Sequence, residues 1–126
     1  MRDVLRRRSM CETLCISAVL LAAMPLLGCK KDNVDQRAQG KALFGSMCAR
    51  CHGDNGAGGL PVYDGGPAPR NFTDHEFHTK HVDAELRQTI INGKGTGMPA
   101  FGTTFTSEQL DALVAYVRSL DPGGNK

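Results

Sequence analysis

The pentapeptide CARCH, residues 48–52, constrains this sequence more than any other feature, because it separates two cysteines by two residues and places a histidine directly after the second. Three kinds of site use such a pattern: half of a zinc site, a dithiol redox centre, or the attachment point of a haem. Each alternative makes a different demand on the remaining cysteines, histidines and methionines, so the rest of the chain discriminates between them.

The first 28 residues are typical of an export signal. A basic cluster, LRRRSM, precedes an apolar run over residues 14–27 that reads LCISAVLLAAMPLL. This run is shorter than the roughly 20 residues that a membrane-spanning helix needs, and Pro25 would disturb such a helix. Its length and flanks predict a signal peptide over residues 1–28 that is removed, and the alternative is a short membrane anchor that stays attached.

Residues 26–29, LLGC, resemble the lipobox of bacterial lipoproteins, in which the cysteine is acylated and becomes the mature N-terminus. The resemblance implies lipid on Cys29, a lipidated tether over residues 29–34, and a position on the periplasmic or cell-surface side of a bacterial membrane. Several acyl chains would hold firmly, because a single chain binds a membrane only marginally. The alternative is ordinary cleavage nearby, which would leave Cys29 as a spare thiol.

The formal net charge of +2 comes from the N-terminal segment alone. Of the 15 basic and 13 acidic residues, four arginines and two acidic residues lie among the first 28, which leaves eleven of each sign in the remainder. A domain with balanced charge gives no reason to expect a nucleic-acid partner.

The mature chain predicts a small all-α domain with long loops. Helices are expected over residues 35–47, 83–92 and 106–120. Residues 53–69 are rich in Gly, Pro, Asn and Asp and predict a loop. The last helix has the clearest pattern, because Thr106 opens a capping box and a continuous apolar face follows it. No segment shows the alternation of a strand, so no sheet is expected.

The inward-facing positions follow from the helical spacing of apolar residues. In the first two helices they are Ala38, Leu43, Phe44, Met47, Leu86 and Ile90. In the last helix they are Leu110, Leu113, Val114, Val117 and Leu120. Gly40 within the first helix costs about 1 kcal/mol relative to alanine, which indicates close approach by another element.

Zinc and dithiol chemistry each leave part of the CARCH pattern unexplained. After removal of the signal peptide, only Cys48 and Cys51 remain for a zinc site. Further ligands would have to come from the three evenly spaced histidines, His75, His78 and His81. A dithiol centre would open a helix beside a βαβ pattern, which the predicted elements do not contain, and it gives the adjacent histidine no role.

Haem attachment uses every residue of the pattern, because C-x-x-C-H is the signature of c-type haem. The thiols of Cys48 and Cys51 would add to the vinyl groups of the porphyrin as thioethers, and His52 would bind the iron. Covalent attachment secures a large cofactor in a domain too small to hold it by burial alone. Haem of this type is attached outside the cytoplasm, in agreement with the export signal.

The second axial ligand of the iron is predicted to be Met98. Of the two methionines that follow the signal peptide, Met47 is adjacent to Cys48 and is fixed on the attachment side. Met98 lies in NGKGTGMPAF, where glycines let the backbone approach a flat ring and a proline follows the ligand. Two alternatives are open: Met98 fills the core, or one of the histidines in residues 75–81 binds the iron. These histidines are otherwise interpreted as part of a solvated polar segment.

From residue 35 onward, the chain resembles the class I monohaem cytochromes c. The resemblance is carried by GKALFGSMCARCHG, PRNFTD, GTGMPAF and the final helix. It implies the small cytochrome c fold over residues 35–126, with about three to four helices and long loops wrapped around one covalently bound haem c. The first and last helices of that family cross tightly, so Gly40 and Phe44 are expected to meet Tyr116.

The same resemblance implies the surroundings of the haem. A proline carbonyl, from Pro67 or Pro69, would orient His52 through its other ring nitrogen. Arg70 would neutralise a haem propionate, or it is simply an exposed arginine. Val82 departs from the Ser or Thr that often caps the middle helix of the family, so the start of that helix is left open.

An iron bound by both His52 and Met98 has no open position and can only change its oxidation state. The resemblance therefore implies an electron carrier, not an enzyme, that passes single electrons between a donor and an acceptor protein. Two alternatives stay open. One is a haem peroxidase or gas sensor with a displaceable sixth ligand, and the other is a haem subunit of a larger oxidase or dehydrogenase complex.

Overall fold

The computed structural model describes residues 31–124, and the predicted signal peptide and Cys29 lie outside this range. Its helices are α1 (Lys31–Met47), α2 (Ala49–His52), α3 (His75–Lys80), α4 (Asp83–Asn92) and α5 (Ser107–Ser119). Within the described range, the only β-type pairing is an isolated antiparallel bridge between Lys94 and Met98. None of these helices is long and apolar enough to cross a membrane.

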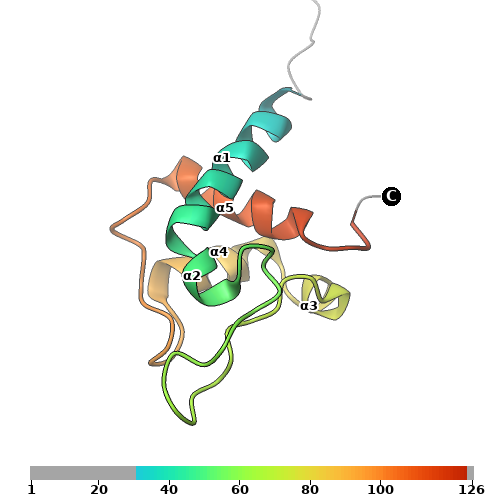
Figure 1. Ribbon diagram of the computed structural model, residues 1–126. Helices are drawn as coiled ribbons and strands as arrows, with labels where there is room; N and C mark the ends of the chain where they lie inside the picture. Colours follow the sequence, from blue (N-terminus) through green and yellow to red (C-terminus); the bar gives the residue numbers. More distant parts are fainter. Residues whose placement is uncertain (1–30, 125–126) are drawn as a thin grey trace, which may run out of the picture.

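Helix α1 crosses α5, and this crossing organises the domain (Figure 1). Gly40 is buried at the crossing point, where an added Cβ would overlap the carbonyl oxygen of Ala112 and come within 2.8 Å of the Tyr116 Cβ. One turn further along α1, the Phe44 side chain is 2 % exposed, and its ring centroid lies 5.2 Å from that of Tyr116. The predicted contact of Gly40 and Phe44 with Tyr116 is confirmed.

The core lies between α5, α1 and α4. Helix α5 contributes most of it, through Leu110, Ala112, Leu113, Val114, Tyr116 and Val117. In α4, Leu86 is buried and Ile90 packs against the core, as predicted. The expectation that Ala38 and Met47 face inward is wrong, because both are exposed. Helices α1 and α5 cross at an angle (Figure 1), so only a short stretch of α1 reaches the core.

The start of α1 also differs from the prediction. The helix begins at Lys31, ahead of the expected start at residue 35, so part of the predicted tether is helical. Residues 31–34, KDNV, contain neither Pro nor Gly, so nothing in this segment stops a helix before the predicted start.

Local hydrogen bonds set the starts of α4 and α5. The Thr106 hydroxyl accepts from the Gln109 N–H at 3.3 Å, and the Gln109 side chain accepts from the Thr106 N–H at 2.9 Å, which confirms the predicted capping box. Val82 has no side-chain oxygen with which to cap α4, but the Glu85 carboxylate accepts the Val82 N–H at 3.3 Å. Helix α4 therefore starts at Asp83, as predicted.

Helix α3 replaces the solvated polar segment expected over residues 75–81. Asp74 caps this helix, and its carboxylate accepts from the Glu76 N–H at 3.0 Å. His78 is only 9 % exposed, so the expectation of a solvated side chain is wrong for this residue. A helix of six residues is too short to show its period in the sequence.

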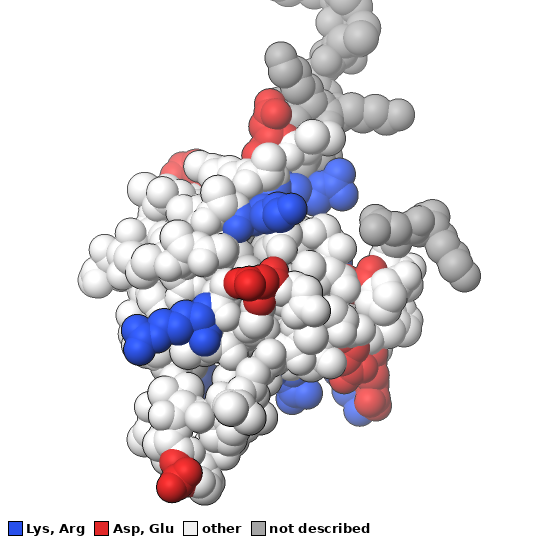
Figure 2. Space-filling model, in the orientation of Figure 1, with Lys and Arg blue, Asp and Glu red and all other residues white. Residues whose placement is uncertain are grey.

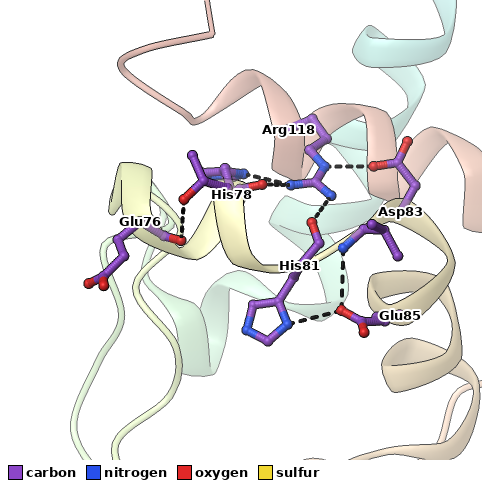
Figure 3. Close-up of polar contacts among 8 residues, drawn as sticks. Glu76, His78, His81, Asp83, Glu85 and Arg118 are labelled. Atoms are coloured by element: carbon purple, nitrogen blue, oxygen red, sulfur yellow. Dashed lines mark hydrogen bonds and ion pairs between the residues drawn. The ribbon is translucent and has the colours of Figure 1, made fainter.

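Arg118 of α5 holds α3 against the start of α4 (Figure 3). Its guanidinium donates to the backbone carbonyls of His78 at 3.0 Å and His81 at 2.5 Å. It also forms an ion pair with Asp83 at 2.7 Å. Carbonyl groups at the end of α3, which have no partner within the helix, thus receive charged donors.

Replacing Gly40 with alanine should destabilise the protein by about 1–3 kcal/mol, because the added methyl group forces α1 away from α5. Gly45 is the matched control in the same helix, since a Cβ there meets nothing within 4 Å. Gly45→Ala should instead be stabilising by about 0.5–1 kcal/mol through its higher helix propensity. Chemical denaturation of the haem-loaded protein measures both variants, and equal stabilities would contradict the tight crossing.

Candidate haem site

Cys48, Cys51 and His52 lie together where α1 ends and the short helix α2 begins. The Cys48 N–H donates to the Phe44 carbonyl at 2.8 Å, and the His52 N–H donates to the Cys48 carbonyl at 2.9 Å. One helical turn therefore carries all three side chains. Both thiols are free and half-buried, and Cys48 packs against the core. The motif is thus attached directly to the crossing of α1 and α5.

The His52 ring has the orientation that an iron ligand needs. Its Nδ1 lies 3.1 Å from the backbone carbonyl oxygen of Arg70, and a carbonyl can only accept, so Nδ1 carries the proton. The lone pair of the neutral ring is then on Nε2, which is left for a metal. Burial lowers the pKa of His52 and outweighs the Arg70 hydrogen bond that raises it, so the ring is neutral at pH 7.

The carbonyl partner of His52 belongs to Arg70, so the expectation of Pro67 or Pro69 is wrong. The Pro69 carbonyl lies against Gly58 instead, where an added Cβ would come within 2.9 Å of its oxygen. The next carbonyl along the chain faces the imidazole. The orienting hydrogen bond is present, but the residue after the second proline provides it.

The predicted site residues do not include Phe72, yet its ring stacks on the His52 imidazole, with centroids 4.6 Å apart and an interplanar angle of 22°. Its backbone is fixed on both sides. The Phe72 N–H donates to the Gly56 carbonyl at 2.7 Å, and the Phe72 carbonyl accepts from His78 Nε2 at 2.6 Å. Arg118 holds His78 in turn, so the stacked ring is connected to α5. The only feature of the sequence that could have indicated this stacking is the aromatic residue in the segment PRNF, residues 69–72.

The thiols do not have the electrostatics of a dithiol redox centre. Burial, reinforced by the neighbouring Cys51, raises the pKa of Cys48 to about 11. Catalytic dithiols depend on a lowered pKa, because the thiolate is the nucleophile. Cys48 is a neutral thiol at pH 7, which disfavours the dithiol alternative.

Each of the three histidines in and after α3 has a hydrogen-bond partner. His75 pairs with Asp121 at 2.9 Å, and its hydrogen bond lowers the pKa of that carboxyl. His81 pairs with Glu85 at 3.1 Å. The third, His78, is bonded to the stacked phenylalanine described above. His75 and His81 each use only Nδ1 in these pairs. Within residues 31–124, no group of three or more His, Cys, Asp or Glu side chains could hold a metal ion, which disfavours the zinc alternative. A histidine as the second axial ligand remains the alternative to Met98.

Met98 lies in a tight loop between α4 and α5. Two backbone hydrogen bonds between Lys94 and Met98, of 2.9 and 3.2 Å, close this loop, and Gly93 turns the chain into it with a φ of 71°. Met98 is half-buried, whereas Met47 is 43 % exposed on α1. The role of Met98 as an iron ligand stays a prediction.

A small all-α domain that carries a C-x-x-C-H turn, with its imidazole oriented through Nδ1, is that of a c-type haem protein. Residues 35–117 match the family described as "Cytochrome C oxidase, cbb3-type, subunit III", and the chain belongs to this family of cytochrome c domains. Membership confirms the predicted small cytochrome c fold and covalently bound haem c. The chain is therefore a cytochrome c domain that carries haem c.

Similar proteins differ in how much of their length the chain covers. The FixP subunit of a cbb3-type cytochrome c oxidase from Azorhizobium caulinodans is 32% identical over 108 residues, which cover 86% of this chain and 35% of that subunit. The CcoP subunit from Azospirillum brasilense is 34% identical over 103 residues, which cover 80% of this chain and 34% of that subunit. The chain thus spans about a third of the length of these oxidase subunits.

The match covers a larger share of two other cytochromes. Cytochrome c6 of Aphanizomenon flos-aquae is 32% identical over 78 residues, which cover 62% of this chain and 83% of that protein. The solved structure of the KustC0563 c-type cytochrome has a TM-score of 0.54 and 31% identity, and the match covers 65% of this chain and 96% of that one.

Replacing His78 with leucine should destabilise the protein by about 1–3 kcal/mol, because the Phe72 carbonyl loses its donor. His78→Gln keeps an N–H donor and should recover part of this loss. His75→Ala is the control, because that side chain is 58% exposed and its ion pair should contribute at most about 1 kcal/mol. Unfolding of the haem-loaded variants in denaturant gives the comparison, and equal losses for the two histidines would refute the buried role of His78.

Proposed function

We propose that this chain is a membrane-tethered electron carrier in which His52 and Met98 bind the haem iron and Cys48 and Cys51 bind the porphyrin. The observation that carries the proposal is the hydrogen bond from His52 Nδ1 to the Arg70 carbonyl, because it leaves Nε2 as a ligand beside two free thiols. When bound, haem supplies the reversible one-electron reduction of iron. The protein holds and orients the ligands and controls their access to water.

Met98 supplies the second ligand in this proposal. Its thioether is a soft ligand that favours the reduced iron and so raises the reduction potential. The backbone bridge between Lys94 and Met98 restricts the loop on which the side chain lies. With both axial positions filled, no position is open for oxygen or a substrate, and electron transfer is the reaction that is left.

Arg70 has two roles in the proposal. Its carbonyl orients His52, and its exposed guanidinium neutralises a haem propionate. The guanidinium carbon lies 5.6 Å from the centroid of the Phe77 ring. Stacking of this kind restricts the side chain but leaves its hydrogen-bond donors available for a carboxylate.

The export-signal pattern of residues 1–28 and the LLGC segment support a lipid anchor on Cys29. The haem domain of residues 35–126 then works on the periplasmic or cell-surface side of a bacterial membrane. Its partners are redox proteins, and such encounters typically bury little surface. Figure 2 shows acidic and basic side chains interspersed on one face, with wide uncharged areas between them, so this face has no single-sign patch for long-range steering.

The similarity to FixP and CcoP favours a second candidate, because these proteins are subunits of cbb3-type oxidases. In that case the chain would be the haem subunit of a larger complex. Gentle solubilisation of membranes followed by purification through a tag on this chain distinguishes the two candidates. A carrier is recovered alone, whereas a subunit is recovered with the other chains of an oxidase.

Replacing Met98 with alanine should abolish the ferric sulfur-to-iron charge-transfer band and open the iron to cyanide or carbon monoxide. Met98→His should keep six-coordinate, low-spin iron but lower the potential, because imidazole stabilises the ferric state. A change of about 59 mV in a one-electron couple corresponds to about 1.4 kcal/mol, and loss of an iron–sulfur bond should exceed it. Absorption spectra with redox titration test both variants.

Met47→Ala is the matched control for Met98, since that side chain is 43 % exposed on α1. Its spectrum and potential should equal those of the unmodified protein. If Met98→Ala behaves in the same way as this control, Met98 is not the ligand and the carrier proposal fails in its present form.

Replacing Cys29 with serine should abolish acylation and release the protein from membranes, because the residue would no longer offer a thiol for lipid attachment. Labelled fatty acid and membrane fractionation follow both properties. Cys15→Ser is the control, because this cysteine lies inside the predicted signal peptide and its loss should leave the label in place. Equal labelling of the Cys29 variant and the unmodified protein would exclude Cys29 as the lipid site.

A further inference from the structure

One hydrogen bond between side chains joins the loop that follows the attachment motif to the loop that carries Met98. The hydroxyl groups of Tyr63 and Thr96 lie 2.8 Å apart, although the two residues are 33 positions apart in the chain. Among the residues that the structure describes, no other side-chain hydrogen bond reaches the segment 94–98.

Tyr63 begins a turn over residues 63–66, and the turn packs against the Tyr63 ring. The Gly66 N–H donates to the Tyr63 carbonyl at 3.0 Å, and Gly65 has a φ of 73°, a conformation that favours glycine. A Cβ at Gly66 would come within 2.8 Å of the Tyr63 ring. The Tyr63 ring thus packs on this turn, and a side chain at Gly66 would have to displace it.

Thr96 lies at the tip of the loop that its neighbours close. The Lys94 N–H donates to the Met98 carbonyl at 2.9 Å, and the Met98 N–H donates to the Lys94 carbonyl at 3.2 Å. Thr96 is the central residue between these two positions. A hydrogen bond to its hydroxyl consequently fixes the tip of a loop whose base contains Met98.

We propose that Tyr63 is a positioning residue for Met98, which it holds in place through Thr96. This inference rests on the proposed function, in which Met98 binds the iron. Withdrawal of the thioether requires the loop to move, and movement of the loop breaks the hydrogen bond between Tyr63 and Thr96. The bond therefore opposes displacement of Met98 by an external ligand. A typical net hydrogen bond changes such an equilibrium by about 2- to 10-fold.

The test is a cyanide titration of the ferric, haem-loaded protein, followed through loss of the sulfur-to-iron band. Tyr63→Phe removes only the hydroxyl and should tighten cyanide binding by about 2- to 10-fold. Thr96→Val should have the same effect, and the double variant should add nothing further, because both changes remove one bond. Thr96→Ser retains a hydroxyl and should bind cyanide as the unmodified protein does.

A general loss of stability is separated from positioning by Thr106→Ala, which removes the cap of α5 and lies outside the segment 94–98. This variant should melt at a lower temperature and keep the unmodified cyanide affinity. Equal tightening in Thr106→Ala and Tyr63→Phe would overturn the positioning role. Unchanged cyanide affinity in Tyr63→Phe and Thr96→Val would also overturn the positioning role. If the sulfur-to-iron band is present in that case, the proposal that Met98 binds the iron still stands. If the unmodified protein has no such band, the proposed function fails and this inference fails with it.

Discussion

The packing of α1 against α5 at Gly40 is the contact on which the rest of the structure depends. Because this position has no side chain, the two helix backbones come close together, and Phe44 enters the same core as Tyr116. Cys48 follows one turn later, and its N–H donates to the Phe44 carbonyl. The haem-attachment motif therefore takes its position from the helix crossing. A small domain buries little apolar surface of its own, so a covalently bound haem adds apolar contacts that such a domain needs.

A second series of contacts runs from α5 to the predicted iron ligand. Arg118 binds the carbonyl of His78, and His78 donates to the carbonyl of Phe72. Phe72 then stacks on the imidazole of His52, whose other side is oriented by the carbonyl of Arg70. The ligand thus has its orientation fixed by contacts within the protein. Such support from outside the ligand set is what tunes metal sites and keeps their geometry constant when the metal changes charge.

Local patterns in the sequence predicted the parts of the fold that local forces determine. The apolar face of α5 repeats over 13 residues and its cap needs only adjacent residues, so the extent and burial of this helix could be predicted. Helix α3 could not, because six residues show no period and Arg118, which holds it, is 40 positions from His78. The exposure of Ala38 depends on the angle at which α1 crosses α5, which the periodicity of the sequence does not contain. The carbonyl that accepts the His52 hydrogen bond could not be predicted either, because no sequence motif shows that the Pro69 carbonyl lies against Gly58 and leaves the Arg70 carbonyl to face the imidazole.

The contacts that orient the candidate haem ligand all connect residues within the matched segment 35–117 or directly after it, as Arg118 does. The match covers 96% of the KustC0563 cytochrome and 35% of FixP, so similar sequence makes up almost a whole chain in one protein and about a third of a chain in the other. Because the orienting contacts all lie within the domain, they do not distinguish the proposed carrier from a subunit of an oxidase. The features that would distinguish the two are the surfaces that meet partners and the proposed attachment to the membrane. In the proposed function, coordination by His52 and Met98 restricts the domain to electron transfer, and its outer surface determines the protein with which it exchanges electrons.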